Sequence, residues 1–269
     1  MDQITELIAE GKGKRLYATE NPDEAVVYYR DETFAFHGLK RGRIIGKGEI
    51  NNLICEYMFT LLKDKGVPNH FIRRIDNRCS LVKRVEIIPV SVKVRNIVAG
   101  SLAKRIGYPD GTKLKNTVVE HCLKDPELED PLVNLTHITA MGLATPEEIE
   151  IMSHYALRVN EILCECMREI NIELIDFKLE FGRFHGEILL ADEVSPDTCR
   201  FWDARTHEPL DLDCFRHDLG NVEEAYREVL HRLTGNVLKN GEEDECYAFQ
   251  RQSSDEHRRH RVLRRRGAG

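Results

Sequence analysis

The sequence predicts an α+β fold with two lobes, a strand-rich N-terminal lobe over residues 1–88 and a larger mixed lobe over residues 89–236. Two patterns support this fold class. Turn signals separate short β-branched and aromatic runs in the first hundred residues, whereas the second half contains two long segments with helical periodicity. Strands and helices that gather in different parts of a chain favour α+β architecture over an alternating βαβ sheet.

The N-terminal lobe is predicted to contain strands around one helix. A glycine-rich run over residues 11–17, an Asn-Pro turn and the run 25–30 predict a strand, a turn and a second strand. Apolar residues recur at helical spacing over residues 50–62, and a glycine and a proline soon afterwards end this helix. The β-branched run 81–98 is interrupted only by Pro89, so we expect two strands that meet near this proline.

The larger lobe is predicted to contain two helices and a pair of strands. Residues 145–148 read Thr-Pro-Glu-Glu, a capping box with proline at the first helical position, and the apolar stripe behind them runs over residues 149–170. A second helix is expected over residues 221–235, between an asparagine and a glycine. Residues 172–181 and 187–194 predict two strands joined by a five-residue loop.

Composition excludes several classes of protein. The 269 residues are 41% hydrophobic and 32% charged, which is an ordinary globular profile. The longest apolar run, residues 25–29, is five residues long, whereas a bilayer span needs about 20. The first residues are acidic, unlike the basic start of a signal peptide. We therefore expect a cytoplasmic protein that has no contact with a membrane.

The charge is unevenly distributed. The net charge is −7, but residues 251–269 carry seven arginines against two acidic residues, so the first 250 residues sum to −12. An acidic body argues against nucleic acid as a ligand, and an anionic substrate would need local lysines and arginines. The apolar pattern ends after Leu238, and we expect residues 237–269 to form a disordered tail.

Lys12 and Lys14 are candidates for phosphate binding. They lie two residues apart on the presumed glycine-rich strand, so both side chains would point to one face. Gly11 and Gly13 would let a ligand approach the backbone closely, which suits a polyphosphate. The alternative is a solvated edge strand, where lysines are common.

Alternation along one predicted strand places Asp176, Lys178 and Glu180 on the same face. If the following loop is centred on Phe184, Asp192 of the return strand falls opposite Asp176. A face with three carboxylates and one lysine is costly unless a divalent cation or a substrate neutralises it. The alternative is a solvated sheet face.

Residues 95–105 lead from a strand into a short helix. Ser101 would be the N-cap of this helix, where free N–H groups and a hydroxyl form a natural site for a phosphate monoester; a plain cap is the alternative. A turn over residues 195–198 delivers Arg200 back toward the acidic strand. Arg216 is a weaker candidate, because a surface salt bridge explains it equally well.

Seven blocks in order along residues 8–235 resemble a single family. The blocks are Gly11-Lys12-Gly13-Lys14, Lys47-Gly48-Glu49-Ile50-Asn51-Asn52, Val94-Arg95-Asn96, Ala99-Gly100-Ser101-Leu102-Ala103-Lys104-Arg105, Asp130-Pro131-Leu132-Val133-Asn134, Asp176-Phe177-Lys178-Leu179-Glu180-Phe181-Gly182 and Ala191-Asp192-Glu193-Val194-Ser195-Pro196-Asp197. They strongly resemble the SAICAR synthetase family of purine biosynthesis. The DFKLEFG block and the RN-x3-GS-L-x-KR block are highly specific.

The resemblance implies an ATP-dependent ligase. The family joins L-aspartate to the carboxylate of carboxyaminoimidazole ribotide (CAIR) through an acyl phosphate, and the products are SAICAR, ADP and phosphate. The resemblance implies ATP in the cleft between the lobes, Mg²⁺ as a second cofactor, and a homo-oligomer, most simply a dimer. A small-molecule kinase is an alternative, as is a nucleic-acid-binding protein that uses the basic tail.

The resemblance also implies roles for individual residues. ATP binding falls to Lys12, Gly13, Lys14, Lys83, Glu180 and Asp192. Magnesium binding falls to Glu180 and Asp192. Substrate binding falls to Arg95, Ser101, Lys178, Arg200 and Arg216, with Ser101 and Arg200 toward the CAIR phosphate. Catalysis falls to Lys178, Glu180 and Asp192.

Two segments depart from the family pattern. Pro89-Val90-Ser91 stands where Pro-x-Glu is usual, and residues 34–38 differ from the usual Ser/Thr-Ala-(Phe/Gly)-Asp-Gly. The Lys124-Asp125 segment fits the family's Lys-x-Asp stretch loosely. No role is therefore assigned to Ser91 or His37.

Overall fold

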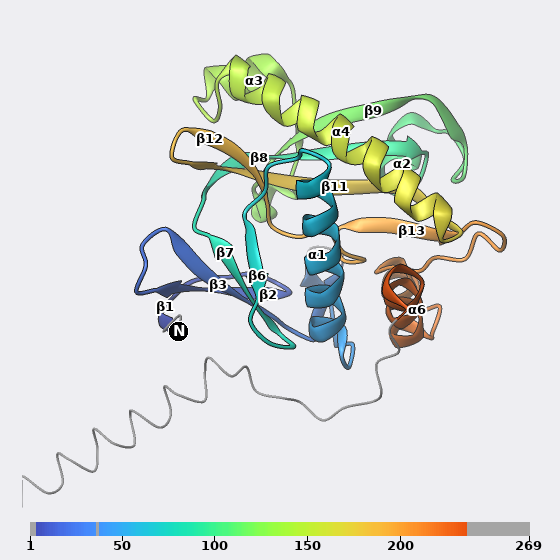
Figure 1. Ribbon diagram of the computed structural model, residues 1–269. Coiled ribbons are helices and arrows are strands. Elements are labelled where there is room, and N and C mark those ends of the chain that lie inside the picture. The colour runs from blue at the N-terminus through green and yellow to red at the C-terminus, as the bar shows by residue number, and fades with distance from the viewer. Residues whose placement is uncertain (1–3, 36–37, 236–269) are drawn as a thin grey trace, which may run out of the picture.

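The computed structural model describes residues 4–35 and 38–235, and its strands form two main sheets (Figure 1). The first sheet contains, in order, β1 (Ile4–Glu10), β2 (Lys14–Thr19), β3 (Glu24–Tyr29), β7 (Cys79–Lys83) and β6 (Phe71–Arg74). The second contains β10 (Leu132–Val133), β9 (Lys113–Leu123), β8 (Glu86–Ile97), β11 (Ile172–Phe184) and β12 (Glu187–Ala191), with β13 (Cys199–Asp203) paired to β11. A separate hairpin contains β4 (Glu32–Ala35) and β5 (Lys40–Arg43).

The helices confirm the α+β class. They are α1 (Lys47–Asp64), α2 (Ser101–Ile106), α3 (Leu135–Ala140), α4 (Pro146–Glu169), α5 (Asp213–Arg216) and α6 (Val222–Thr234), with a short 3-10 helix, η2 (Pro126–Leu128). None of the helices in the described part of the chain has both the length and the apolar character of a membrane span. The predicted tail, residues 237–269, and His37 lie outside the described residues.

The first sheet confirms the predicted strand pair but corrects the position of Lys12. β2 and β3 pair antiparallel with Lys14 opposite Tyr29. Lys12, however, lies in the turn between β1 and β2, which is closed by a hydrogen bond from the Gly11 N–H to the Lys14 carbonyl. Lys12 and Lys14 therefore do not share a strand face, because an unpredicted strand, β1, precedes this turn and the chain reverses at the glycines.

Helix α4 covers one face of the second sheet (Figure 1). Its N-terminus is the predicted capping box: the Thr145 hydroxyl accepts from the Glu148 N–H, and the Glu148 carboxylate accepts from the Thr145 N–H. The predicted stripe is buried at five positions: Ile149, Met152, Ala156, Val159 and Leu163. These side chains belong to a core cluster that also includes residues of the first sheet, so one core joins the two sheets.

The turn between β11 and β12 is shorter than predicted. Phe184 pairs with Glu187, so only two residues form the turn, and Glu180 pairs with Ala191. Asp192 therefore follows the end of β12 near Glu180, and the expectation that it lies opposite Asp176 is wrong. His185 and Gly186 both adopt positive φ, as a two-residue hairpin turn requires, and this turn sets the register.

The predicted strand junction at Pro89 is also wrong. The break lies between β7 and β8, at residues 84–85, and Pro89 is inside β8. Ser91 opposes Glu180, but Ile87 opposes Gly182, so the pairing of β8 with β11 is irregular around this proline. An irregular register accommodates a residue that has no N–H to donate.

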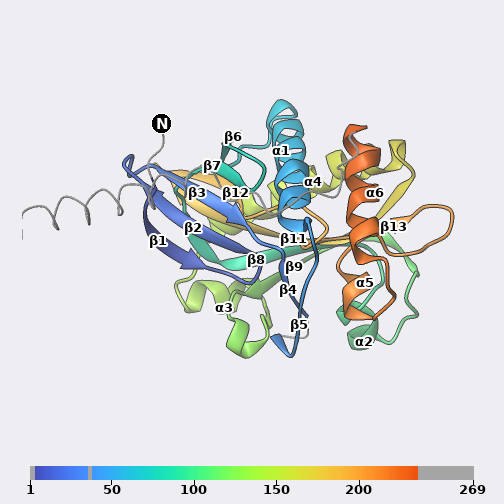
Figure 2. The same cartoon turned by 90° about the horizontal axis from the view of Figure 1, so that it is seen from below.

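Helices α1 and α6 pack against each other beside the sheets (Figures 1 and 2). Helix α6 lies between Asn221 and Gly235 as predicted, although the Asn221 side chain makes no capping hydrogen bond. The N-terminus of α1 is held from outside the helix by Asp31, which accepts hydrogen bonds from the N–H groups of Gly48 (2.9 Å) and Gly46 (3.4 Å). The buried Arg78 guanidinium pairs with both oxygens of Asp31, at 2.8 and 3.0 Å.

Two backbone hydrogen bonds join the sheets next to His70. Its N–H donates to the Leu190 carbonyl at 2.9 Å, and the Leu190 N–H donates to the Pro68 carbonyl at 3.0 Å. The His70 ring is buried, packs edge-on against Phe59, and its Nε2 has no hydrogen-bond partner. Burial lowers the pKa of His70 from about 6.5 to about 4, so the ring is neutral at physiological pH.

We expect the change Arg78→Met to lower the free energy of unfolding by about 3–5 kcal/mol, because it leaves the Asp31 carboxylate buried without its cation. Urea denaturation followed by circular dichroism measures this effect. Arg74→Met is the matched control, since the pair of Arg74 with Glu56 is about one-third exposed and should contribute less than about 1 kcal/mol. Equal losses in both variants would contradict the anchoring role of Arg78.

We expect His70 to make stability depend on pH. Its pKa is about 6.5 in the unfolded chain and about 4 in the fold, so only the unfolded state takes up a proton in between. The free energy of unfolding should therefore fall, by at most about 3 kcal/mol, as the pH drops from 6.5 toward 4. Urea titrations across this range should show a weaker pH dependence for His70→Gln, while the exposed control His154→Gln should follow the wild type.

Candidate functional site

The face of the second sheet opposite α4 carries the predicted charged residues. Along β11, Asp176, Lys178 and Glu180 share this face, while Phe177 and Leu179 are buried in the core, as the alternation predicts. In register, Arg95 lies opposite Asp176 and Ser91 lies opposite Glu180. Strand β8 therefore continues the polar face across the sheet.

One end of this face holds a cluster of ion pairs that draws on both sheets. Lys14 of β2 pairs with Asp192, and its Nζ lies 2.8 Å from a Glu193 oxygen. The two Glu180 oxygens lie 2.7 Å from the Nζ of Lys178 and 2.5 Å from the Nζ of Lys124. We call the following residues the lysine–carboxylate cluster: Lys14, Lys47, Lys124, Lys178, Glu180, Asp192, Glu193 and Asp197.

Burial and pairing act in opposite directions on these groups. Burial alone would lower the pKa of Lys14, but the carboxylates of Asp192 and Glu193 outweigh it and raise that pKa above its usual range. Burial would raise the pKa of Asp192, but Lys14 and Lys178 hold it well below its usual range. Burial does raise the pKa of Glu193, which also lies near two other carboxylates. Lys14 is therefore cationic and Asp192 is anionic at neutral pH.

A second cluster lies further along the same face. The Asp176 carboxylate accepts from Arg95 at 2.9 Å and from Arg200 at 2.6 Å. Arg200 and Arg216 also pair with Asp213, at 2.5 and 2.6 Å. We call the following residues the arginine cluster: Arg95, Ser101, Asp176, Arg200, Asp213 and Arg216. Two aspartates thus bring three predicted substrate residues together, and the fourth, Ser101, joins them through Arg95.

Ser101 belongs to this cluster, but it is not a helix cap. The N-cap of α2 is Gly100, and Ser101 is the first helical residue. The Ser101 hydroxyl accepts from the Arg95 guanidinium at 3.1 Å. Gly100 has φ +54°, a backbone conformation that favours glycine, and a Cβ there would lie 2.8 Å from Arg200 Nη2.

Two predicted ATP-binding lysines lie outside the clusters. Lys12 is exposed in the turn after β1. Lys83 is the last residue of β7, and its Nζ lies 5.3 Å from the centre of the Phe184 ring, a cation–π contact between the two sheets. The structure therefore brings Lys14, but not Lys12, to the carboxylates.

Sequence reasoning missed several members of the lysine–carboxylate cluster. Lys47 and Asp197 lie within the quoted motifs, but no role was assigned to them. Glu193 follows Asp192 directly, and Lys124 lies in a segment that fits the family loosely. The only signal for Lys47 was a lysine between two glycines at the start of a helix. Its partner is 150 residues away, so spacing could not reveal the pair.

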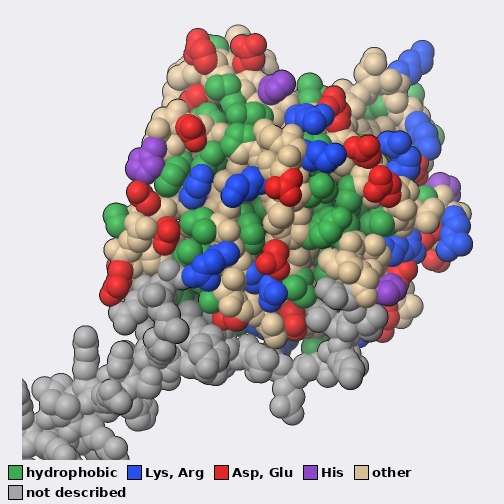
Figure 3. All heavy atoms as spheres, viewed as in Figure 1, with side chains coloured by type: hydrophobic (Ala, Val, Ile, Leu, Met, Phe, Trp, Pro, Cys, Tyr) green, Lys and Arg blue, Asp and Glu red, His purple; other side chains and the backbone are tan. Residues whose placement is uncertain are grey.

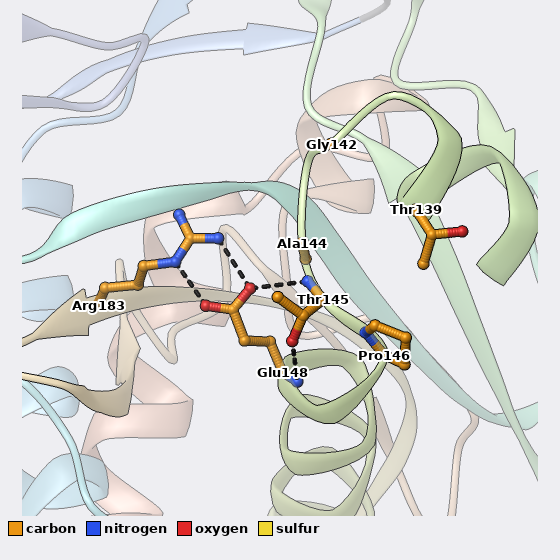
Figure 4. Close-up of a pocket in the computed structure, with 7 residues that line it drawn as sticks. All are labelled: Thr139, Gly142, Ala144, Thr145, Pro146, Glu148 and Arg183. Atoms are coloured by element: carbon orange, nitrogen blue, oxygen red, sulfur yellow. Dashed lines mark hydrogen bonds and ion pairs between the residues drawn. The ribbon is translucent and has the colours of Figure 1, made fainter.

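A hollow of about 300 Å³ lies at the N-terminus of α4 (Figure 4), and none of the residues that line it belongs to either cluster. Arg183 points at Glu148 there, and the two side chains form paired contacts of 2.5 and 2.8 Å (Figure 4). The two charged side chains that line the hollow therefore pair with each other. On the face drawn in Figure 3, acidic and basic side chains are interspersed and form no large region of one sign.

The carboxylates can hold a metal ion only together with another ligand. Among residues 4–35 and 38–235, no group of three or more His, Cys, Asp or Glu side chains is placed to hold a metal. Mg²⁺, however, usually takes one or two protein carboxylates together with phosphate oxygens and water. Glu180 and Asp192 fit that donor set, since hard carboxylate oxygens from β11 and from the residue after β12 would share the ion with a polyphosphate.

Two named proteins are similar to this chain in sequence over most of its length. The protein from Brevibacillus brevis called phosphoribosylaminoimidazole-succinocarboxamide synthase is 55% identical over 233 residues, which is 86% of this chain and 98% of the relative. The protein of the same name from Persephonella marina is 52% identical over 228 residues, which is 85% of this chain and 96% of the relative.

Solved structures of proteins with the same name, or named SAICAR synthetase, have the same fold as this chain. The crystal structure of phosphoribosylaminoimidazole-succinocarboxamide synthase from Ehrlichia chaffeensis matches with a TM-score of 0.84 and 43% identity, and the match covers 87% of this chain and all of that one. A SAICAR synthetase in complex with ADP matches with a TM-score of 0.84 and 42% identity over the same shares. The model of the family described as SAICAR synthetase matches residues 7–233, which include both clusters. By sequence, by fold and by the residues gathered on the face of β11, the chain belongs to the SAICAR synthetase family.

Proposed function

We propose that the protein is an ATP-dependent ligase that joins L-aspartate to the CAIR carboxylate and releases SAICAR, ADP and phosphate. The observation that carries this proposal is the presence of two clusters of paired cations and carboxylates on one strand face, joined by Asp176, Lys178 and Glu180 of β11. Each cluster contains cations that could bind the phosphate of one phosphorylated substrate, and the reacting groups would meet between the clusters. Family membership, and the ADP complex of a relative that is 42% identical, support the nucleotide.

The lysine–carboxylate cluster is the proposed ATP site. Lys14 would exchange its carboxylate partners for phosphate oxygens, and Gly13 lets the triphosphate approach the backbone. Lys12 lies in the same turn and can reach the nucleotide from solvent, while Lys83 marks the strand that leads from one sheet to the other. On this proposal the lobes are residues 1–88 and 89–236, and the nucleotide lies between them.

Glu180 and Asp192 are the proposed magnesium ligands. When bound, Mg²⁺ would offset charge on the transferring phosphoryl group. The lysines around Asp192 hold the pKa of its carboxyl well below its usual range, so this carboxylate is in the ionised state that binds a cation. Lys178, paired with Glu180, presents its ammonium on the same face and would hold the CAIR carboxylate near the phosphate.

The arginine cluster is the proposed CAIR site. Arg200 and Arg95 present guanidinium groups that can grip phosphate oxygens in pairs, and the Ser101 hydroxyl lies beside them. Arg216 extends the cluster through Asp213 and would face L-aspartate. The compact monoester of a ribotide suits this site, whereas the extended triphosphate requires the glycine–lysine strand.

The reaction proceeds in two displacements. A CAIR carboxylate oxygen attacks the γ-phosphorus, and the bond to the ADP oxygen breaks. The aspartate amine then attacks the carbonyl carbon of the acyl phosphate, phosphate leaves, and the nitrogen loses a proton. A free carboxylate is a poor acylating agent, which explains why ATP is consumed. Fixed cations at the transferring group supply most of the stabilisation that the protein can provide.

A coupled assay tests the function. With ATP, CAIR, L-aspartate and Mg²⁺, we expect SAICAR and ADP in equal amounts. Without L-aspartate, each enzyme molecule should form no more than one molecule of ADP. Continued ADP formation would identify a kinase instead. On the basis of the family we also propose a cytoplasmic dimer, which light scattering after size-exclusion chromatography tests.

Arg200→Ala should weaken the use of CAIR and spare ATP. The loss of one charge-assisted contact to the ribotide phosphate should lower kcat/KM for CAIR by about ten- to a hundredfold. The KM for ATP should remain within about twofold of the wild type, because Arg200 belongs to the other cluster. Initial rates with each substrate varied in turn measure both quantities. A raised KM for ATP with an unchanged KM for CAIR would show that the two phosphate sites are reversed.

Asp192→Asn should raise the Mg²⁺ concentration needed for half-maximal rate and lower turnover, because the amide is a weaker ligand than the carboxylate. Magnesium titrations at saturating substrates measure the effect, and circular dichroism checks the fold. Asp64→Asn, an exposed position at the end of α1, is the control and should titrate like the wild type. An unchanged magnesium requirement would remove Asp192 from the metal site.

A further inference from the structure

One buried ion pair of the lysine–carboxylate cluster lies under the glycine-rich turn, and it has been given no role of its own so far. Lys47 is the first residue of α1, and its side chain is only 1% exposed. Its Nζ lies 2.6 Å from Asp197 Oδ2. A Cβ built on Gly13 would lie 3.3 Å from that Nζ and 3.4 Å from that oxygen. The backbone of the turn therefore rests directly on the ion pair.

Tyr226 of α6 completes the arrangement. Its side chain is fully buried, and its hydroxyl donates to Asp197 Oδ1 at 2.6 Å. Both oxygens of Asp197 are thus engaged, each by a different helix, while Asp197 itself lies in the turn after β12. We call Lys47, Asp197 and Tyr226 the positioning triad. It connects three segments that are far apart in the sequence and packs under a fourth, the glycine-rich turn.

A chain of hydrogen bonds continues from the triad to Lys14. The Asp197 N–H donates to the Ser195 hydroxyl at 3.1 Å, and this hydroxyl donates to Glu193 Oε2 at 2.7 Å. The other Glu193 oxygen lies 2.8 Å from Lys14 Nζ. A shift of Asp197 would therefore move both the turn that contains Gly13 and the carboxylate that aims Lys14.

Stability does not explain the ion pair. A buried lysine and a buried aspartate each lose their hydration, and apolar side chains of similar volume are often as stable or more so. An ion pair and a hydrogen-bonded tyrosine fix the geometry, because each buried polar atom has few alternative partners. The position of the triad, under the turn and behind Lys14, indicates what that geometry fixes.

We propose that Lys47, Asp197 and Tyr226 are positioning residues for the nucleotide phosphates. They hold the glycine-rich turn in the position in which its backbone contacts the phosphates. Through Ser195 and Glu193 they also orient the Lys14 side chain. The proposal rests on the proposed function, in which Lys14 contacts ATP. The arginine cluster shares no residue with the hydrogen bonds that run from Asp197 to Lys14, so CAIR binding is independent of the triad.

The variant Tyr226→Phe tests the triad with the smallest change, since it removes one hydroxyl and keeps the ring. We expect its ADP dissociation constant, measured by isothermal titration calorimetry with Mg²⁺, to rise about tenfold, and the KM for ATP with it. The KM for CAIR should stay within twofold of the wild type. Lys47→Met, a similar volume without charge, should give the same pattern from a different helix.

Tyr155→Phe is the matched control, because it makes the same chemical change on α4, away from the triad, and should bind ADP like the wild type. Unfolding in urea is measured for every variant. If Tyr226→Phe and Lys47→Met alter the unfolding midpoint but leave ADP affinity unchanged, the triad is purely structural and the proposal is wrong.

Lys14→Met separates this result from a failure of the proposed function. If Lys14→Met weakens ADP binding and the triad variants do not, the positioning role of the triad is wrong, while the proposed nucleotide site is supported. If Lys14→Met binds ADP like the wild type, the nucleotide site is misplaced, and the role of the triad falls with it. Weakened binding in all three variants, with an unchanged KM for CAIR in the two triad variants, supports the proposal.

Discussion

The antiparallel pairing of β11 with β8 is the constraint on which the rest of the structure depends. Successive side chains alternate between the faces, so this pairing buries Phe177 and Leu179 under α4 and places Asp176 and Glu180 on the other face. A slip of one residue would exchange the two sets and bury carboxylates in an apolar core. The burial of apolar side chains that stabilises the sheet therefore also fixes the positions of the charged side chains. The same strand contributes residues to both clusters.

The cations of the two clusters on that face are paired with carboxylates. Four lysines meet four carboxylates in the lysine–carboxylate cluster, and two aspartates join the three arginines of the other cluster. An anionic substrate would displace a carboxylate from its lysine or arginine without requiring the cation to move far. Cations held in place before binding cost little reorganisation during the reaction, which is the basis of electrostatic catalysis. The same pairing keeps the ionised groups tolerable inside the protein.

Contacts between distant segments hold the parts of the site in place. Asp31 and Arg78 anchor the start of α1, and Gly48 is required there because a Cβ would lie 2.5 Å from both the Arg78 guanidinium and the Tyr29 carbonyl oxygen. The hairpin of β4 and β5 docks on α5, where Lys40 hydrogen-bonds to the Phe215 carbonyl and the Phe215 ring covers Gly42. Helix α5 carries Asp213 and Arg216, so the N-terminal segment reaches the arginine cluster as well as the lysine–carboxylate cluster.

The sequence by itself determined the features that depend on near neighbours. The alternation of residues 176–181, the capping box of α4 and the pairing of β2 with β3 follow from side-chain periodicity and turn chemistry, and the structure confirms them. The family motifs also lie within single segments. Only the tertiary structure decided the partners of these segments, because Lys14 meets Asp192 across 178 residues of sequence. The two-residue turn that places Asp192, the hydroxyl of Ser101 that meets Arg95 instead of capping a helix, and the ion pair of Lys47 all depend on register and packing between elements, which short-range patterns do not specify.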